Sequence, residues 1–462
     1  MMHPLRHRLQ NAYVEFLILY HAFEDINCNI LNMRLICKFY AYGEYLFEIL
    51  KNANISITDF NRMRRAPEFW VNKYNHIGSL HIGDVPIKYM HYWKHCHTVS
   101  LHNLPLLDDV SAFKDCKSVN LYYLPNLKNV NCLRNVATLT IDSLDGVTDV
   151  SCLGNVDTLK LAHLDNLREF GSLNKVRDLW ICGCLIDNVD GFSNEYLKLQ
   201  NVPHLKYANR LVGVKKLTLY DINIRNINHL GKIPDVSLSL MPVIDVRALK
   251  KIKTLRLSCL DNVTDVSMLG KVHNLSLYRL NRIVDVNALG SVKKLTLSGL
   301  HGVTDVSALR NVHTLDLIHM RGITYVGCLK GVKNLTLADL QIEYVDGLDG
   351  VEKLELKNLC NVYDIDCLTG VKDLTVDNLP IKYVSVLGKI PTLTLRNLPN
   401  VENVNALSNV KKLTLDKLTK VHNMNVLYNV PELTIENMYI VYKGDNLDQI
   451  LRLHNCNWGL KV

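Results

Sequence analysis

The sequence lacks the segments and motifs that mark several large classes of protein. No run of about 18 apolar residues occurs in its 462 residues, so no transmembrane helix is predicted. A P-loop, a G-x-S-x-G elbow, an H-E-x-x-H motif and a glycine-rich dinucleotide fingerprint are all missing. These absences argue against the enzymes that depend on such motifs, and we expect neither an enzyme nor a bound cofactor.

The chain also lacks an N-terminal apolar segment ending in small residues, so no secretory leader is expected. Its 13 cysteines do not suggest disulfides. Cys132, Cys152, Cys328 and Cys367 occupy a repeat position that holds alanine in other copies. Such a position is expected to be small and buried, with thiols that pack in a reducing compartment. We therefore expect a cytoplasmic location, with the nucleus second.

One short phrase recurs about every 20 residues over most of the chain. Its clearest copy is VTDVSALRNVHTLDLIHM, from Val303 to Met320, and near copies begin at Val147, Val263 and Ile283. A period of this length predicts a solenoid, in which each unit buries its apolar face only against its neighbours. Function is therefore expected on an extended surface and not in a pocket.

Each copy contains a Leu-x-Leu core that predicts a short β-strand. In the copy at Leu295 to Leu297, the two leucines would face inward and Thr296 outward. The outward residue is usually Thr or Ser, which suits a pleated surface and can hydrogen-bond to its copy in the next coil. The strands should therefore stack in register as one long parallel sheet.

The rest of each copy is too short for a long helix. In Asp305 to Leu309, D-V-S-A-L, we expect the Ser or Asn to cap one turn of 3₁₀ or α-helix. The acidic or amide residue that begins this segment has two interpretations: a stacked cation ladder, or an acceptor for backbone N–H groups of its own turn. Replacement of Asp by Asn, and by Tyr325, Tyr344 and Tyr383, favours the second.

These copies resemble leucine-rich repeats, and V-T-D-V-S-x-L resembles the I-x-D-I-x-x-L phrase of internalin-type repeats. The resemblance implies an α/β solenoid with a long parallel β-sheet on the concave face and short 3₁₀ or turn segments on the convex side. The family's Asn-ladder position is apolar here, as at Leu300 and Met320. Buried turn amides then need other partners. We expect these from Asp109, Asn129, Asp149, Asn188, Asn226, Asp245, Asp265, Asp285, Asp305, Asp364, Asn403 and Asn423.

The first 75 residues differ in composition and carry apolar residues at helical spacing. Leu31 to Tyr40, LNMRLICKFY, resembles the third-helix phrase of the F-box, L-x-x-L-R-L-V-C-K-x-W, although Gln10 stands where that family usually has Pro. An F-box before leucine-rich repeats is a common adaptor layout, with degenerate versions in large DNA viruses of protists. The resemblance implies docking to the linker subunit of a cullin-based ubiquitin ligase. The docking residues would be Leu17, Phe23, Leu35, Ile36 and Cys37. The alternative is a small α-helical cap on the first coil, and both can hold.

We therefore divide the chain into three parts. Residues 1–75 form a helical, F-box-like N-terminal domain, residues 76–440 a leucine-rich repeat solenoid of about 18–20 coils, and residues 441–462 a C-terminal cap.

The leading hypothesis for function is a non-enzymatic protein–protein interaction scaffold, acting as a substrate-recruiting adaptor. Interface energy concentrates in Trp, Tyr and Arg, and the outward face of the predicted sheet is otherwise lined by Thr and Ser. The partner-binding residues on this concave face would be Tyr122, Trp180, Tyr220, Arg256 and Tyr278. Trp180 has a second explanation, as a cover for Lys160 or Lys198.

Two alternatives stay open. One is a structural or virion-associated repeat protein without a ligase connection. The other is a parallel β-helix enzyme acting on polysaccharide, which requires D-V-S to be a full strand and a convergent group of carboxylates. The acidic outward candidates are Asp373, Asp377, Asp416 and Glu436. Lysines and arginines lie among them, which favours a mixed-charge contact surface.

The net charge of +8 is spread along the repeats, so lysine pairs such as Lys293 and Lys294 are expected to form a solvated edge. Without a concentrated basic stripe or an RNA-binding motif, neither nucleic acid nor a membrane is a predicted partner. The one metal-like grouping is His91, His95, Cys96, His97 and His102. Strand alternation would send Cys96 inward and its neighbours outward, so no metal site is predicted.

Overall fold

A computed structural model describes residues 54–57, 79–84, 96–167, 171–205, 208, 211, 213–421 and 424–438. The chain divides into two compact units, residues 1–215 and 216–462, which we treat separately. The predicted N-terminal helical domain and the C-terminal cap lie outside the described residues. So do the predicted docking residues Leu17, Phe23, Leu35, Ile36 and Cys37.

The Leu-x-Leu cores form short parallel strands, as predicted, and each strand pairs with the next one in its unit. The described strands of the first unit are β1 (Asn54–Ile57), β2 (Ser79–Gly83), β3 (Thr98–His102), β4 (Ser118–Tyr122), β5 (Thr138–Asp142), β6 (Thr158–Ala162), β7 (Asp178–Cys182) and β8 (Tyr196–Gln200). Those of the second are β9 (Lys216–Tyr220), β10 (Asp235–Ser239), β11 (Thr254–Ser258), β12 (Asn274–Tyr278), β13 (Lys294–Ser298), β14 (Thr314–Ile318), β15 (Asn334–Ala338), β16 (Lys353–Lys357), β17 (Asp373–Asp377), β18 (Thr392–Arg396), β19 (Lys412–Asp416) and β20 (Glu432–Glu436).

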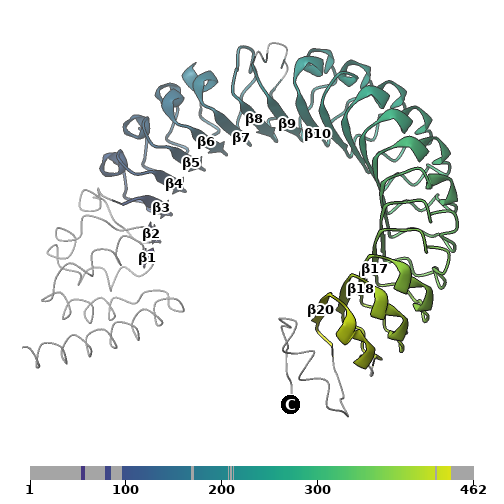
Figure 1. Cartoon of the computed structure of the whole chain (residues 1–462). Coiled ribbons are helices and arrows are strands. Elements are labelled where there is room, and N and C mark those ends of the chain that lie inside the picture. Colours follow the sequence, from purple (N-terminus) through teal and green to yellow (C-terminus); the bar gives the residue numbers. More distant parts are fainter. Residues whose placement is uncertain are drawn as a thin grey trace, which may run out of the picture. The chain divides into compact units, whose positions relative to one another are not determined.

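Short 3₁₀ helices lie opposite the strands in most coils, and no α-helix occurs in the described ranges. They are η3 (Ser111–Phe113), η4 (Asn131–Leu133), η5 (Ser151–Asn155), η6 (Gly171–Lys175), η7 (Asn228–Lys232), η8 (Arg247–Leu249), η9 (Ser267–Lys271), η10 (Asn287–Ser291), η11 (Ser307–Asn311), η12 (Gly327–Leu329), η13 (Ser385–Lys389), η14 (Asn405–Asn409) and η15 (Asn425–Asn429). Within each unit the strands lie on the inner side of the bend and the 3₁₀ segments on the outer side (Figure 1). The predicted solenoid of parallel strands and short 3₁₀ segments is confirmed.

Register explains why the strand face is regular. In β12 and β13, Leu275 pairs with Leu295, Ser276 with Thr296 and Leu277 with Leu297, so equivalent positions stack. The leucines of this inner ladder are buried, and Leu297 is 0% exposed. Because strand neighbours lie about 4.8 Å apart, each ladder is a close-packed apolar column.

In most coils, an acidic or amide residue closes the turn that leads to the outer side of the coil. Asp305 Oδ1 accepts a hydrogen bond from the Ser307 N–H at 2.8 Å. The expected capping role of Ser307 is wrong, because Ser307 is the first residue of η11 and its N-cap is Val306, without a side-chain bond. The same acceptor role is played by Asp109, Asn129, Asp149, Asn188, Asn226, Asp245, Asp265, Asp285, Asp364 and Asn403. The interpretation as acceptors within each turn is thus confirmed, and Asn423 lies outside the described residues.

A second polar column, which the sequence did not predict, follows the strands. The residue directly after nearly every strand has a positive φ, such as 52° at Asn358 and 57° at Asn378. Asn is among the non-glycine residues that tolerate this conformation best. Asn378 Nδ2 donates to Asn358 Oδ1 at 2.9 Å, and Asn358 Nδ2 donates to Asp339 Oδ1 at 3.1 Å. An exposed amide ladder therefore exists one residue before the family's usual ladder position.

Recurring glycines occupy two different repeat positions. Gly270 and Gly290 lie two residues before a buried valine, whereas Gly331 and Gly350 lie directly before one. A Cβ atom at Gly290 would overlap the carbonyl oxygen of Ala308 in the next coil. Close approach of neighbouring coils, and not a special φ, therefore requires glycine there.

The cysteines behave as packing groups. The ten cysteines among the described residues are free. Burial raises the pKa of the Cys96 thiol, and likewise that of Cys116, to about 12. The repeat position of Cys132 and Cys152 is half-buried, not fully buried as expected. A raised pKa keeps these thiols protonated near neutral pH and therefore poorly nucleophilic.

Candidate interaction surface

The strand face presents three outward columns of side chains. In most strands the second and fourth residues are buried, while the first, third and fifth are at least partly exposed. In β17, for example, Asp373, Thr375 and Asp377 face outward. Parallel register carries each of the three positions from strand to strand. A partner that crosses this face would therefore meet rows of side chains spaced by the strand separation of about 4.8 Å.

The five predicted partner-binding residues all face outward but do not form one column. Tyr122, Tyr220 and Tyr278 are the fifth residues of their strands, whereas Trp180 and Arg256 are third residues. Tyr122 and Trp180 belong to the first unit and the other three to the second. A patch that joins all five therefore stays a prediction.

Within the second unit, the predicted residues are partly engaged by neighbours. Tyr220 and Tyr278 are 38% and 39% exposed, and two intervening strands separate them. Arg256 forms an ion pair with Asp235 at 2.9 Å. Arg279 lies 5.1 Å from the centre of the Tyr278 ring. These contacts hold the side chains in place on the face of the sheet.

Trp180 is held between two lysines on the neighbouring strands. The Nζ atoms of Lys160 and Lys198 lie 4.3 and 3.9 Å from its ring centre. Each such cation–π contact stabilises an exposed pair by about 0.5–1 kcal/mol. These contacts agree with the alternative explanation of Trp180, as a cover for its neighbouring lysines.

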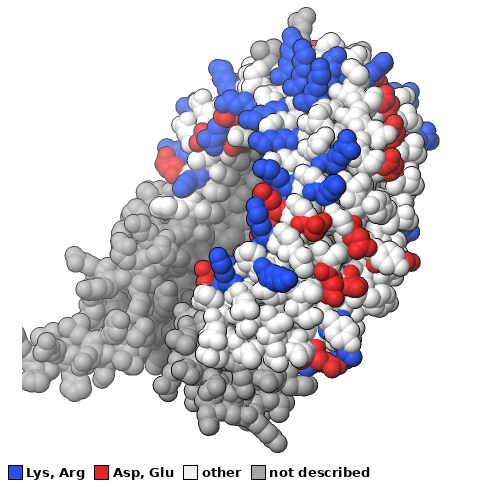
Figure 2. Space-filling view, turned by 45° about the vertical axis from the view of Figure 1, so that its right-hand side comes forward, with Lys and Arg blue, Asp and Glu red and all other residues white. Residues whose placement is uncertain are grey.

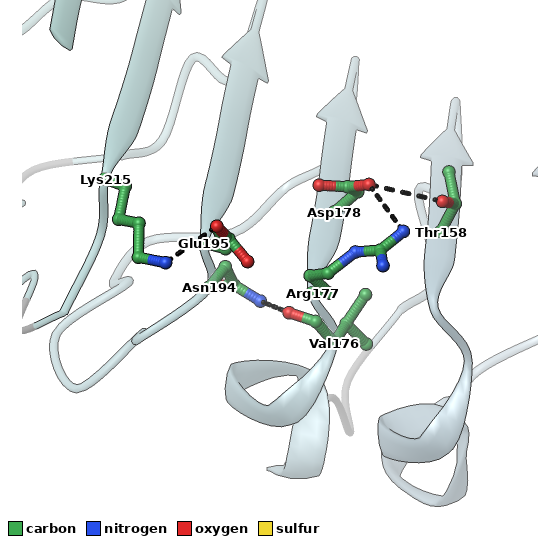
Figure 3. A network of polar contacts seen from close by, with 7 residues as sticks. All are labelled: Thr158, Val176, Arg177, Asp178, Asn194, Glu195 and Lys215. Carbon is green, nitrogen blue, oxygen red and sulfur yellow. Dashed lines mark hydrogen bonds and ion pairs between the residues drawn. The ribbon is translucent and has the colours of Figure 1, made fainter.

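Polar contacts continue along the edge where β7 and β8 begin (Figure 3). Asp178 Oδ2 is 3.4 Å from the Arg177 guanidinium and 3.5 Å from the Thr158 hydroxyl. Asn194 is 1% exposed and donates to the carbonyl oxygens of Leu173 and Val176 at 2.7 and 2.6 Å. Asn194 stands where other coils carry a buried valine, so this coil is held by hydrogen bonds as well as by apolar packing.

The acidic candidates near the C-terminal end lie among basic side chains. Asp373 pairs with Lys353 at 3.1 Å, and Asp416 lies 3.9 Å from Arg396. The intermixed charges agree with a contact surface. The β-helix alternative also loses its premise, because the D-V-S segments lead into 3₁₀ helices and not into full strands.

A row of exposed tyrosines lies at the turns that precede the 3₁₀ side of four successive coils. Tyr325, Tyr344, Tyr363 and Tyr383 are 64%, 67%, 69% and 68% exposed. Three of them stand where other coils carry the turn-closing Asp or Asn, and Tyr363 stands directly before Asp364. We call these four residues the tyrosine row. The sequence showed the substitutions, but only as interruptions of the acidic column.

The described ranges contain no group of three His, Cys, Asp or Glu side chains placed to hold a metal ion. Cys96 is buried and His97 exposed, as alternation predicted, while His91 and His95 lie outside the described residues. The described part also contains no helix with the length and apolar character needed to cross a membrane.

No protein-family model and no curated protein matches the chain. Among solved structures, the internalin InlF of Listeria monocytogenes is 18% identical, with 62% of this chain and 86% of that chain covered and a TM-score of 0.42. The functional domain of InlJ from Listeria monocytogenes is 12% identical, with 64% and 72% covered and a TM-score of 0.36. A complex of TLR13 with ssRNA13 is 15% identical, with 85% and 68% covered and a TM-score of 0.47.

Proposed function

We propose that the chain is a non-enzymatic scaffold that binds protein partners through the tyrosine row. The observation that carries this proposal is the exposure of four aromatic side chains on four successive coils. Tyr is enriched at the energetic centres of protein interfaces, and large apolar side chains grouped on a surface commonly mark such sites. A tyrosine at this position also forfeits the turn-closing hydrogen bond that Asp305 makes, so local stability does not explain the choice.

The test uses substitutions that the repeat itself tolerates. Partners captured by the immobilised full chain would be identified, purified and titrated against the triple variant Tyr325→Asn, Tyr344→Asn, Tyr383→Asn. Asn occurs naturally at this position as Asn403 and there closes its turn. We expect binding to weaken by about 30-fold or more, since interface centres contribute about 2 kcal/mol or more, without loss of thermal stability.

The matched control is Trp180→Ala on the strand face, at the site predicted from the sequence. A partner that loses affinity with Trp180→Ala but not with the triple variant would move the site to the strand face. Unchanged binding in both variants would contradict protein binding at either surface and would overturn the proposal.

The finer role that we propose is a substrate-recruiting adaptor, in which the F-box-like segment docks to the linker subunit of a cullin-based ubiquitin ligase. The support for it is the LNMRLICKFY phrase at Leu31 to Tyr40 followed by repeats. The test is binding of the purified linker subunit to the full chain and to its Leu35→Ser, Ile36→Ser variant. Equal binding, or none by the unaltered chain, would remove the ligase connection and leave the scaffold proposal standing.

A further inference from the structure

Basic side chains gather on one edge of the second unit. The edge runs from the end of each 3₁₀ segment to the first residue of the following strand, on the five successive coils that lead into β11 to β15. The residues involved are 250–254, 270–274, 290–294, 310–314 and 330–334, and none of them is Asp or Glu. We call their nine cations the basic edge. They are Lys250, Lys251, Lys253, Lys271, Lys293, Lys294, Arg310, Lys330 and Lys333.

The basic edge is not neutralised by its surroundings. All nine cations except the half-buried Lys250 are exposed, and none has a described carboxylate within 4.0 Å. In the coils that follow the basic edge, lysines are paired with carboxylates. Lys353 pairs with Asp373, Lys372 with Glu352 and Lys412 with Glu432. Figure 2 shows Lys and Arg gathered on the upper part of the visible face, with a column of Asp and Glu along its right margin and further Asp and Glu lower down.

The backbone fixes the spacing of these charges. The Asn274 N–H donates to the Lys253 carbonyl at 2.9 Å, and the Thr314 N–H donates to the Lys293 carbonyl at 3.0 Å. This bond recurs from coil to coil, so Lys253, Lys293 and Lys333 stand on one column with a histidine between each pair. At about 4.8 Å per coil, the basic edge extends over roughly 19 Å.

The composition of the basic edge selects the class of partner. Its 25 positions contain no Phe, Tyr or Trp, and their apolar residues are buried Val and Ile. Protein interfaces are depleted in lysine and enriched in aromatic residues, and single-stranded nucleic acids are held by stacking on aromatic side chains. Membrane-surface segments insert apolar side chains beside their charges. A row of lysines alone suits a rigid array of phosphates.

We propose that the basic edge binds the phosphate backbone of a nucleic-acid duplex, without regard to its sequence. Roughly 19 Å of B-form DNA carries about 11 phosphates, counting both strands, which is comparable to the nine cations available. This binding is additional to the proposed protein contact. From the sequence, no nucleic-acid partner was predicted, because the recurring lysines were interpreted as a solvated edge without a concentrated basic stripe.

The test is fluorescence anisotropy of a labelled random-sequence DNA duplex of about 20 base pairs with the full chain. The edge variant is Lys253→Gln, Lys293→Gln, Lys333→Gln. The control variant is Lys353→Gln, Lys372→Gln, Lys412→Gln, which removes the same net charge from cations that are already paired. We expect the edge variant to bind about 10-fold or more weakly near 0.1 M salt, and the control to change by less than about 3-fold.

Salt dependence gives a measurement that does not rely on the control. Loss of three phosphate contacts should reduce the slope of log K against log salt by about 2–3. Equal loss of binding in the edge and control variants would overturn the proposal, as would no binding by the unaltered chain. Preference for an oligothymidine single strand over the duplex would overturn it, and so would binding only to vesicles of phosphatidylserine and phosphatidylcholine.

Discussion

At the scale of single residues, Asp149 shows how one side chain closes a turn. Its Oδ1 atom accepts the Ser151 N–H at 2.7 Å. Hydrogen bonds from the Ser151 side chain and then from its backbone N–H lower the pKa of the Asp149 carboxyl. In the preceding coil, Asn129 Oδ1 accepts the equivalent hydrogen bond from the Asn131 N–H. The requirement is therefore for an acceptor oxygen, and charge is secondary.

The prediction for Asp149 separates these two contributions. Asp149→Ala should lower the free energy of unfolding by about 0.5–1 kcal/mol, as loss of a capping acceptor does, whereas Asp149→Asn should cost less. Because the folded-state pKa is lowered, the carboxylate contributes stability above its unfolded-state pKa and loses it as pH falls through the folded-state value. Denaturant titrations at pH 7 and near pH 3 would show this difference. A pH-independent gap between Asp149 and the Asn variant would contradict it.

At the scale of the repeat element, the distance between coils limits which side chains fit. Gly290 and Arg310 occupy the same repeat position, and the carbonyl oxygen of Ala308 in the following coil lies where a Cβ atom of residue 290 would be. Alternation and register were predictable from the Leu-x-Leu pattern. The close approach of the two backbones was not predictable from that pattern, because it depends on how adjacent coils pack against each other.

Gly290→Ala should therefore destabilise the second unit by about 1–3 kcal/mol, since the coils must shift to relieve the overlap with Ala308. Arg310→Ala at the equivalent position is the control and should change stability by less than about 0.5 kcal/mol, as exposed substitutions do. Thermal and denaturant unfolding would measure both. Equal effects of the two substitutions would show that the close approach is absent in solution.

At the scale of the whole molecule, stability is a sum of contacts between neighbouring coils. Each strand pairs only with the strands beside it in its unit, as β13 does with β12 and β14. In such arrays, damage to one coil acts first on its neighbours. The same property lets surface chemistry change from coil to coil without altering the core.

Leu297→Asp places an unpaired charge in the inner ladder, where the side chain is 0% exposed. We expect a loss of about 3–5 kcal/mol, with faster amide hydrogen exchange centred on β12 to β14 and little change in β3 to β7. Ser276→Asp on the outward face of β12 is the control. A loss under about 0.5 kcal/mol for Leu297→Asp would exclude Leu297 from the core.

The sequence by itself determined the solenoid, the inward leucines and the role of Asp305 and its equivalents. Each of these depends on residues close together in the chain and repeated at a constant period, so local geometry was sufficient to predict them. The outward direction of Tyr122, Trp180 and Tyr278 followed from the same alternation.

Only the tertiary structure decided which surface side chains are neighbours. Lys253, Lys293 and Lys333 are about 40 residues apart in sequence but share one column, because parallel register brings alternate coils to the same edge. The same stacking covers Trp180 with two lysines and leaves the tyrosine row exposed. Charge pairing and exposure depend on distances between side chains in different coils. The amino-acid sequence does not give those distances until the coils have been placed in register.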